Sequence, residues 1–378
     1  MIRFFRRSSF PPYLMTADTF LFIALFLYLM QVFIFLIGVR RTRDTLGNHT
    51  TPLVSVIIAA RNEEDNIRTC LQSVSNQTYP RSLYEIIVVD DDSSDATNHV
   101  CQSLSHTIPN LIVISTSGGT TSGGKTNALI VGIEKSKGEL VFITDADCVV
   151  PPTWIESTVR RYEKGIGIVG GLTLQRATGP FEGMQSLDWT YLLGIASAAA
   201  SLGSPLSTIG NNLSFRRRAY DDVGGYRSIG FSVTEDYALF QAIVKSGKWD
   251  YLYPIDPALL VMSTPCRTLK ELMRQKHRWG KGGLDMTLTG FLIMAIGFLL
   301  HSFILVPMLY GSFFGSLVAL AAKWIADYMF LRTITRRVGK ESHLQYFYYF
   351  ELYYHLYVLL LPFIVFFGGK VIWKERKY

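Results

Sequence analysis

Long apolar segments constrain this chain more than any other feature, because about 20 consecutive apolar residues make a helix that crosses a bilayer. The first such run covers residues 19–39. It is too long for the apolar part of a cleaved signal peptide, and no small-x-small cleavage site follows it, so we expect a membrane anchor. A second apolar stretch, residues 288–331, predicts a helical hairpin that turns near Pro307.

The orientation of these segments and the role of the last one stay open at this stage. Arginine flanks both ends of the first run, so the positive-inside rule does not orient it. In the hairpin, Lys323 and Asp327 are four residues apart and are expected to pair. The final apolar run, 344–367, is rich in tyrosine, which is typical of either a span or a helix in the membrane interface. A full span would place the basic tail outside, against the same rule.

The basic excess of the chain is explained by a membrane rather than by nucleic acid. Thirty-seven lysines and arginines oppose 30 aspartates and glutamates, a formal net charge of +7. No nucleic-acid motif is present, so we expect no nucleic-acid partner. Most of the excess flanks the apolar runs, at Arg3, Arg6, Arg7, Arg40, Arg41, Arg43, Arg332, Arg336, Arg337, Lys340, Lys370, Lys374, Arg376 and Lys377.

The four cysteines, Cys70, Cys101, Cys148 and Cys266, are scattered and show no CxxC spacing. A disulfide framework or a zinc site is therefore not expected. We interpret them as buried thiols in a reducing compartment.

Between the anchor and the hairpin, short β-branched runs alternate with helical stretches. The runs are 53–59, 85–90, 111–115 and 140–144. This rhythm predicts an α/β fold with a mostly parallel sheet, which binds ligands at the carboxyl ends of its strands. Polar clusters follow those ends, at 61–63, 90–93, 117–125 and 145–147. Farther along we expect a strand over 167–175, a helix over 181–200 and a helix that opens at Thr234.

Asp145 and Asp147 come directly after the predicted strand 140–144. Two carboxylates two residues apart at a strand end can hold a hard divalent cation and direct it at a diphosphate. Mg²⁺ or Mn²⁺ at that place would neutralise the charge on a departing nucleoside diphosphate. A solvated turn is the alternative, since Asp-x-Asp is common by chance.

Three adjacent carboxylates, Asp90, Asp91 and Asp92, follow the apolar strand before them. They repel one another, so packing does not explain them. One of them could accept the imide hydrogen of a uracil ring. The alternative is a helix start, with Asp92, Ser93 or Asp95 as the N-cap, and the two interpretations are compatible.

The sequence Thr234-Glu235-Asp236 opens the second predicted helix of the later region. A structural interpretation makes Thr234 the cap and places two acids in the first turn. The functional interpretation makes Asp236 the general base that takes a proton from an acceptor hydroxyl.

Just before the hairpin the chain reads Gln275-Lys276-His277-Arg278-Trp279. The guanidinium of Arg278 could bind a diphosphate and the indole of Trp279 could stack on a sugar. A juxtamembrane basic and aromatic belt is the alternative.

Residues 119–126 match the phosphate-binding pattern G-x-x-x-x-G-K-[ST], after an apolar strand and before a helix. A membrane-bound P-loop nucleotide triphosphatase is therefore an alternative from another class. Two observations disfavour it: the loop follows the third predicted strand rather than the first, and the acidic and Gln-x-x-Arg-Trp motifs would have no role. In the preferred interpretation Lys125 still lies near phosphate or base.

Taken in order, these motifs resemble the inverting family 2 glycosyltransferases with a GT-A fold, over residues 52–279 and on into the hairpin. The resemblance is closest to membrane-bound members with the pattern D, DxD, D, (Q/R)xxRW, which include polysaccharide synthases and ceramide glucosyltransferases. It implies a Rossmann-like, mostly parallel α/β domain that uses nucleotide-diphospho-sugars, joined to transmembrane helices.

The resemblance also implies roles for particular residues. Asp91 would bind uracil, Asp147 and Asp145 would hold the metal, and Asp236 would be the catalytic base. Further substrate contacts would come from Ala60, Glu63, Lys125, Asn212, Glu235, Gln275, Arg278 and Trp279, with Asn212 in an acceptor-side loop over 210–216.

We therefore predict an inverting glycosyltransferase with Mn²⁺ or Mg²⁺ as cofactor, a UDP-hexose as donor, and a membrane lipid or lipid-linked acceptor. A processive polysaccharide synthase is the alternative, but it needs a channel of several helices, and the few expected spans favour a single transfer.

We expect a multi-pass protein of the cell membrane with a cytoplasmic catalytic domain, because nucleotide sugars are cytoplasmic. The expected division is a tail (1–18), an anchor (19–39), the catalytic domain (52–283), the hairpin (284–331), a transmembrane or interfacial helix (344–367) and a basic tail (368–378).

Overall fold

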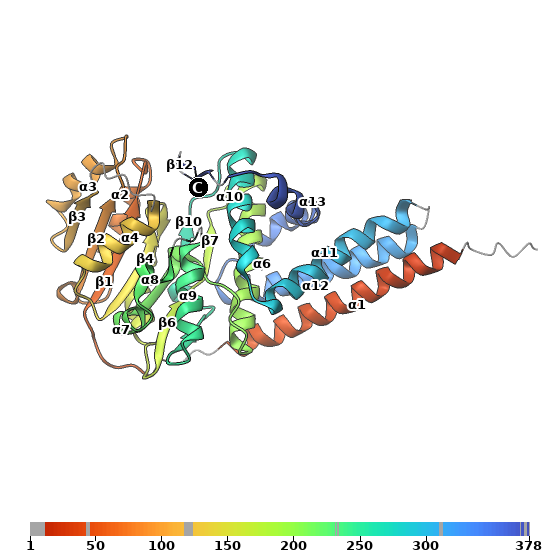
Figure 1. The fold of residues 1–378 in the computed structure, drawn as a ribbon, viewed down its shortest axis with the longest axis horizontal. Helices are drawn as coiled ribbons and strands as arrows, with labels where there is room; N and C mark the ends of the chain where they lie inside the picture. Colours follow the sequence, from red (N-terminus) through yellow and green to blue (C-terminus); the bar gives the residue numbers. More distant parts are fainter. Residues whose placement is uncertain are drawn as a thin grey trace, which may run out of the picture.

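The computed structural model describes residues 12–42, 46–116, 124–230, 232, 234–309, 313–370, 372–373 and 376–377. An α/β domain with a central sheet occupies one end of the molecule, and a bundle of long helices extends from the other (Figure 1). The chain enters through the bundle, builds the α/β domain and returns to the bundle. Among the predicted basic residues, Arg3, Arg6, Arg7, Arg43 and Lys374 lie outside the described residues.

The central sheet has seven strands in the order β3-β2-β1-β4-β8-β6-β9. The first four along the chain pair in parallel, whereas β8 runs antiparallel to both β4 and β6. Those four are the runs predicted from sequence, so the expectation of a mostly parallel α/β sheet is confirmed. The strands are β1 (Val54–Ala60), β2 (Tyr84–Asp90), β3 (Leu111–Ser115), β4 (Leu140–Asp145), β6 (Ile166–Gly170), β8 (Leu213–Arg216) and β9 (Asp250–Leu252).

Helices cover both faces of this sheet. One face carries α2 (Ile67–Ser75), α3 (Thr97–Ser105) and α5 (Trp154–Val159), and the other carries α4 (Gly124–Lys135), α7 (Arg217–Asp222), α8 (Gly225–Ile229) and α9 (Glu235–Lys245).

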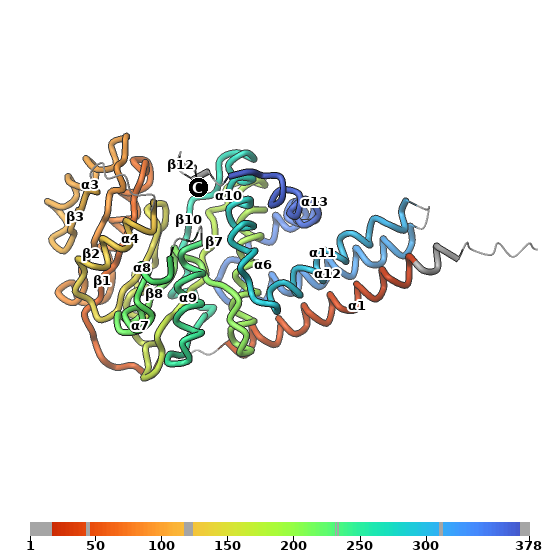
Figure 2. Tube along the Cα trace, in the orientation of Figure 1, coloured from red at the N-terminus to blue at the C-terminus, as the bar shows by residue number. Residues whose placement is uncertain are grey.

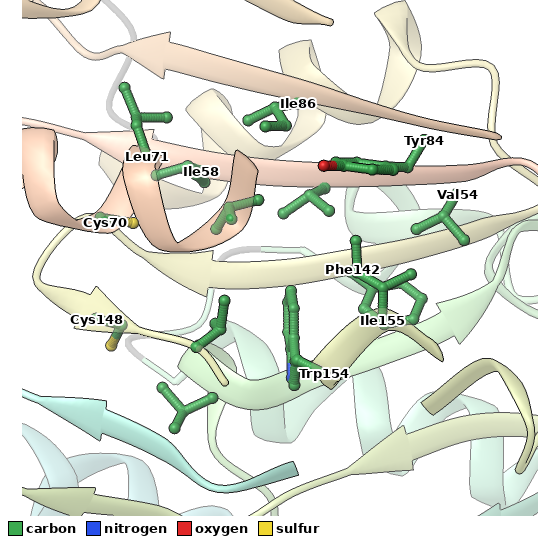
Figure 3. Close-up of a cluster of buried hydrophobic side chains, with 14 of the residues drawn as sticks. Val54, Ile58, Cys70, Leu71, Tyr84, Ile86, Phe142, Cys148, Trp154 and Ile155 are labelled. Carbon is green, nitrogen blue, oxygen red and sulfur yellow. The ribbon is translucent and has the colours of Figure 1, made fainter. Parts of the chain in front are cut away.

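Successive side chains of a strand point to opposite faces of the sheet, so each strand contributes to two hydrophobic cores, one on each face. In β1, Val56 and Ile58 enter the first core and Ile57 enters the second. In the first core, Ile58, Phe142 and Trp154 lie together between the sheet and its helices (Figure 3). Each such fully buried side chain contributes roughly 1.5–3 kcal/mol to folding.

A second sheet of three strands has the order β5-β10-β7. Its strands are β5 (Cys148–Val149), β7 (Thr173–Gln175) and β10 (Val261–Ser263). The prediction of one strand over 167–175 is wrong, because the chain leaves the central sheet after β6 and joins the second sheet as β7. The break falls at Gly170 and Gly171, where the backbone packs directly on Tyr253 and on the amide of Asn212. A short antiparallel hairpin, β11 (Ile372–Trp373) and β12 (Arg376–Lys377), closes the described chain.

Four helices are long and apolar enough to cross a membrane: Ala17–Arg40, Leu288–Leu309, Phe313–Arg337 and Glu341–Phe367. They correspond to α1 (Pro12–Arg40), α11 (Leu288–Leu309), α12 (Phe313–Arg337) and α13 (Phe347–Phe367) with the 3₁₀ turn before it. The two arms of the expected hairpin are present, but Pro307 lies inside α11 and the turn falls after Leu309.

The helix α12 also extends six residues beyond the predicted end of the hairpin, so the basic stretch after 331 begins as helix rather than as a loop. One of its residues contributes to another helix end: Arg337 Nη1 donates to the carbonyl of Val39 in the last turn of α1 (2.8 Å). The same carbonyl accepts from Thr42 Oγ1 (2.8 Å), and the guanidinium adds a positive charge at the negative end of the helix dipole.

Three helices form a layer between the bundle and the sheets: α6 (Pro180–Ser201), α10 (Leu269–Gly282) and α13. In Figure 1, α1, α11 and α12 run side by side along the long axis, whereas α6 and α10 run across it. The same arrangement is visible in the trace of Figure 2. Both ends of α13 contact the other two helices of this layer, because Tyr346 packs on Gly183 of α6 and Gly368 packs on His277 of α10.

The predicted Lys323–Asp327 pair is confirmed and is part of a larger buried network. Lys323 Nζ lies 2.7 Å from Asp327 Oδ2 and 2.6 Å from Oε2 of Glu351 in α13. Asp327 Oδ1 accepts hydrogen bonds from Tyr28 of α1 (2.7 Å) and Tyr191 of α6 (3.1 Å). The charged groups thus pair with one another where four helices, α1, α6, α12 and α13, meet, and they tie the bundle to α6.

Candidate active site

A cavity of about 220 Å³ lies at the carboxyl ends of β1, β2 and β4, where parallel strands place their ligands. Residues of α6, α9 and α10 close it from the other side. Its walls include every residue predicted for the site except Asn212: Ala60, Glu63, Asp91, Lys125, Asp145, Asp147, Glu235, Asp236, Gln275, Arg278 and Trp279.

The ends of β1 and β2 build one corner of the cavity. Ala60 is the last residue of β1, and its carbonyl accepts a hydrogen bond from Asp91 N (2.8 Å). Arg61 Nη1 donates to the carbonyl oxygens of Asp91 (2.5 Å) and Asp92 (2.9 Å), so it clamps the two strand ends together. Glu63 is fixed in the same loop, where its Oε2 accepts from Asn66 Nδ2 (2.8 Å).

The three adjacent aspartates have three different surroundings. Asp90 is buried and accepts from Asn98 Nδ2 (3.0 Å), whereas Asp91 lines the cavity. Asp92 has a left-handed backbone (φ +58°), and its side chain is 61% exposed. The structure therefore singles out Asp91 as the member of the triplet that a ligand in the cavity meets.

None of the three residues considered as a helix cap occupies the cap position. The helix α3 begins only at Thr97, with Ala96 at its N-cap. Asp95 lies one residue before this cap, and its Oδ1 accepts from Thr97 N (2.9 Å), the first residue of the helix.

The Asp-x-Asp pair sits at the end of β4, as predicted. Asp145 ends the strand, and Asp147 leads into β5. Asp147 Oδ2 accepts from Ser263 Oγ of β10 (3.3 Å), and its carbonyl accepts from Thr264 Oγ1 (3.3 Å). The second sheet thereby holds this carboxylate at the cavity.

These carboxylates fit a divalent cation that would arrive with a diphosphate. The cavity walls carry six acidic residues, Glu63, Asp91, Asp145, Asp147, Glu235 and Asp236, and three basic ones, Arg61, Lys125 and Arg278. An anionic diphosphate would enter an acidic site, and a bound divalent cation would offset part of the charge of both. Magnesium-type sites take one or two protein carboxylates and complete their coordination with phosphate oxygens and water.

The thiols nearest this pair, Cys70 and Cys148, are buried among carboxylates, which favours their protonated form. Burial, with the neighbouring Asp147 as the next cause, raises the pKa of both Cys70 and Cys148 well above the ordinary value. A neutral thiol is a poor ligand. Cys148 Sγ instead donates to Asp147 Oδ1 (3.3 Å). Cys70, Cys101 and Cys148 are buried free thiols, as expected, whereas Cys266 is only half-buried.

Lys125 joins the strand side of the cavity to the helix side. It lies in the first turn of α4, and only the last three residues of the predicted P-loop, 124–126, are within the described chain. Its Nζ is 2.7 Å from Asp145 Oδ1 and 3.1 Å from Glu235 Oε1. Burial disfavours the ammonium, but Asp145 and Glu235 outweigh it and raise the pKa of Lys125, so the residue stays charged.

Asp236 is held rigidly beside this pair. It lies in the first turn of α9, its Oδ2 accepts from Gly210 N (2.6 Å), and its Oδ1 accepts from Tyr237 N (2.8 Å). Burial, followed by the neighbouring Glu235 carboxylate, raises the pKa of Asp236 to about 6, against the opposing effect of Lys125. Such a carboxylate is ionised at neutral pH and is a stronger base than an ordinary aspartate.

Thr234 stands at the N-cap of α9, as predicted, but its side chain forms no capping hydrogen bond among the described residues. Its backbone N donates instead to Ser232 Oγ (3.2 Å). The first turn is therefore stabilised mainly by its two acids at the positive end of the helix dipole.

The helix α10 brings Gln275, Arg278 and Trp279 to the cavity on one face. The helix has a side-chain cap, because Thr268 accepts from Glu271 N (3.2 Å). Trp279 meets Trp189 of α6, with ring centroids 5.3 Å apart and planes at 54°. We call these two rings the acceptor wall, because they lie across the cavity from the strand ends that carry Asp91 and Asp145.

Asn212 lies behind the cavity rather than in it, which corrects the prediction. Its Nδ2 donates to the carbonyls of Leu172 and Leu259 (both 2.8 Å), and its Oδ1 accepts from Trp154 Nε1 (3.0 Å). The side chain thus ties the central sheet to the chain leading into β7 and to α5. Its neighbour Asn211 lines the cavity instead.

Several lining residues could not be singled out from sequence. Trp189 is the clearest case, because it sits in an apolar helix without a motif around it. Ser263 and Thr264 follow a three-residue strand of no distinctive pattern. The adjacent acid Asp188 was the single available signal in α6, since a carboxylate inside an apolar helix needs a partner.

Comparison with known proteins agrees with this arrangement. Residues 55–233 match the family described as Glycosyl transferase family 2. The chain is similar to Glycosyltransferase AglE of Haloferax volcanii, 28% identical over 274 residues that cover 69% of this chain and 82% of that protein. It is also similar to Beta-monoglucosyldiacylglycerol synthase of Trichormus variabilis, 29% identical over 237 residues that cover 61% of this chain and 49% of that protein. The chain thus spans about half the length of this second relative.

Among solved structures, the fold is similar to that of Mannosyltransferase PcManGT from Pyrobaculum calidifontis in complex with GDP-Man and Mn²⁺. The TM-score is 0.60 at 17% identity, and the match covers 94% of this chain and 100% of the other. At this identity the likeness is one of fold, and it extends over the sheets and the helices beyond them.

Proposed function

We infer that the chain is a glycosyltransferase, because residues 55–233 form a family 2 glycosyltransferase domain with a GT-A fold. From this premise we propose that it passes a hexose from a UDP-hexose to a membrane lipid or lipid-linked acceptor. The anomeric configuration of the sugar inverts in a single displacement. The chemistry of the cavity and its place beside the membrane-type helices support this proposal.

One observation carries the proposal. Asp91, the Asp145–Asp147 pair, Asp236 and the Arg278–Trp279 pair are far apart in sequence, yet they line a single cavity. A nucleotide site, a phosphate-neutralising site, a base and a stacking surface are what transfer from a nucleotide sugar requires. A set of structural caps and turns would not need to converge.

In the proposed mechanism Asp236 accepts the proton of the acceptor hydroxyl as the oxygen attacks the anomeric carbon. Gly210 N and Tyr237 N keep the carboxylate in place, so little reorientation is needed. The sugar–phosphate bond breaks on the opposite side of the carbon, and Arg278 stabilises the departing diphosphate. Asp91 positions the uracil ring. Lys125 holds Asp145 and Glu235 in register across the cavity.

The proposed cofactor is Mn²⁺ or Mg²⁺, held by Asp147 and Asp145. When bound, it would neutralise charge on the leaving diphosphate.

We further propose that α1, α11 and α12 cross the membrane and that α13 lies along its cytoplasmic surface. Both ends of α13 contact the other two helices of its layer, α6 and α10, so a helix of 21 residues that spanned the bilayer would carry one of these contacts to the far side. Its exposed face is apolar, with Leu352, Leu356, Leu360 and Phe363 between 46% and 60% exposed. This is the pattern of an interfacial helix whose apolar face enters the headgroup boundary.

The experiment that tests the function is nucleotide release by the detergent-purified chain. UDP-, GDP- and TDP-sugars are supplied with Mn²⁺, Mg²⁺ or chelator, with dioleoylglycerol or a lipid extract as acceptor, and ATP in a parallel arm. We expect UDP release that needs metal and rises with lipid acceptor, and a product that carries one sugar.

Three results would contradict the proposal in distinguishable ways. A long polymer from donor alone would favour the processive alternative. ATP turnover without release from any sugar nucleotide would favour the P-loop alternative. Release that persists in chelator would refute the metal.

A further inference from the structure

A buried ion pair lies directly behind the acceptor wall. Lys276 of α10 and Asp188 of α6 are 1% and 3% exposed at their side chains, and Lys276 Nζ pairs with Asp188 Oδ2. Neither residue lines the cavity. Each is nevertheless next to a part of it: Asp188 precedes Trp189, and Lys276 lies one helical turn before Trp279.

The ammonium of Lys276 is also enclosed by aromatic rings. Its Nζ is 4.7 Å from the centroid of the Trp279 ring and 4.9 Å from that of Tyr357 in α13. A cation over an indole face is attracted by the ring, most strongly where water is excluded. The ammonium of Lys276 therefore holds one face of the Trp279 ring. The centroid of the neighbouring Trp189 ring lies 5.3 Å from that of Trp279.

The carboxylate end of the pair is tied to the same third helix. Tyr353 of α13 donates to Asp188 Oδ2 (3.5 Å). The helices α10 and α13 also approach closely, because Val365 and Leu361 of α13 pack on Gly280. The pair thus joins the two helices that carry the acceptor wall, and both charged groups are braced by α13.

A buried ion pair is a poor source of stability, since desolvation offsets most of the attraction between its charges. Packing of these three helices against one another does not require one. A buried charged group can keep an aromatic ring in one orientation, because the group has a fixed position and attracts the ring face from one side. One orientation is required at the acceptor wall, where a ring must face the attacking hydroxyl beside Asp236.

We propose that Lys276 and Asp188 are positioning residues that fix the rings of Trp279 and Trp189, and that the pair thereby sets the affinity for the acceptor but not for the nucleotide sugar. The inference rests on the proposed function, since it assigns the two rings to acceptor binding. It adds a specific role for the second residue of the Gln-x-x-Arg-Trp segment and for an acid in α6.

The test uses a double variant, Lys276→Met with Asp188→Asn, in the full-length chain. Removing both charges leaves no unpaired buried ion, so the fold is expected to survive, whereas either single change would strand a charge. The matched control is Arg227→Met with Glu134→Gln, which removes a surface pair that is 69% and 54% exposed. Initial rates are measured against UDP-glucose and, separately, against dioleoylglycerol in mixed micelles.

We expect the acceptor KM of the double variant to rise about tenfold, with donor KM and acceptor-independent UDP release within about twofold of wild type. The control pair should change neither KM. An unchanged acceptor KM in a folded double variant would overturn the proposal, as would equal losses in both KM values, which indicate general damage.

A second variant keeps the proposal testable if the double variant does not fold. Tyr357→Leu leaves the ion pair intact and removes the ring on the other side of the ammonium. It should raise the acceptor KM about threefold without moving the donor KM, and no change in either would overturn the proposal. If wild-type protein transfers no sugar from any nucleotide tested, the proposed function itself fails, and the inference fails with it.

Discussion

The half of the cavity proposed to bind the donor and the half proposed to bind the acceptor are built in different ways. The donor half consists of side chains that directly follow β1, β2 and β4, and these strands are hydrogen-bonded neighbours in one sheet. The proposed acceptor half consists of side chains from α6, α9 and α10, which meet only through tertiary packing, although Arg278 of α10 is assigned to the diphosphate in the proposed mechanism. Carboxylates dominate the first half, and aromatic rings with a buried ion pair behind them dominate the second.

Because of this difference, one half is suited to recognise its ligand by charge and the other by shape. The donor half is suited to handle a diphosphate, whose charge is its main recognition feature. The acceptor half is suited to a partly apolar molecule that approaches along the layer formed by α6, α10 and α13. Mutations in the two halves should therefore affect different kinetic constants, and each prediction below tests that separation.

The largest kinetic effect confined to one half is expected for Asp147→Asn in the donor half. Loss of a metal-binding carboxylate should reduce the rate of transfer at least about 100-fold, because the leaving diphosphate is no longer neutralised. Metal titration of UDP release measures the effect, and a higher metal requirement should accompany it. Asp92→Asn is the matched control, since this neighbour of Asp91 is 61% exposed and should change little. Equal losses in both variants would show that the two carboxylates are not distinguished by position.

The pH dependence should come from the residue where the halves meet. With the pKa of Asp236 raised to about 6, chiefly by burial, the carboxylate is ionised above that pH and protonated below it. A protonated base cannot accept the hydroxyl proton, so kcat/KM should fall about tenfold for each pH unit below 6. Lys125 lowers the pKa of Asp236, so Lys125→Met should move this acid limb to higher pH. A rate profile that stays flat between pH 5 and 7 would count against Asp236 as the base.

A smaller and more selective effect is expected for Trp189→Phe in the acceptor wall. The indole Nε1 has no hydrogen-bond partner among the described residues, so the change mainly removes ring area. We expect the acceptor KM to rise about fivefold, which corresponds to roughly 1 kcal/mol, with the donor KM unchanged. Trp249→Phe serves as the control, because its indole bonds to Asp222 on the far side of the domain. An increase confined to the donor KM would reverse the assignment of the two halves.

The smallest kinetic effect is expected for Asn212→Ala. Its three hydrogen bonds lie behind the cavity, so their loss should lower the free energy of unfolding by about 1–3 kcal/mol. Thermal unfolding should detect this, while both KM values remain close to those of wild type. A raised acceptor KM with normal stability would restore the role that the sequence suggested for Asn212.

The same division explains what the sequence could predict. Asp91, Asp145 and Lys125 follow strands whose pattern is local, so their approximate positions could be inferred before any tertiary contact was known. Trp189 could not be found, because its role depends on how α6 crosses α10, and neither helix encodes that crossing locally. The choice of Asn212 over Asn211 failed for a related reason: adjacent residues in a 3₁₀ turn point in different directions.

The membrane helices show the same limit. Length and hydropathy identified the apolar segments, but they did not distinguish a span from a helix that lies on the surface. The contacts of Tyr346 with Gly183 and of Gly368 with His277 are the observations behind the interfacial position proposed for α13. The partner of the Lys323–Asp327 pair in α13, Glu351, was equally invisible, since it is 28 residues from Lys323.

The most direct test of the account is Asp236→Asn, because this one carboxylate joins the two halves in a single reaction. Acceptor-dependent UDP release is measured at saturating metal, together with UDP binding and thermal unfolding. We predict a loss of about 10³-fold in kcat with UDP affinity and unfolding temperature near wild type, as expected for the loss of a general base. Transfer within tenfold of wild type in a folded variant would contradict the account.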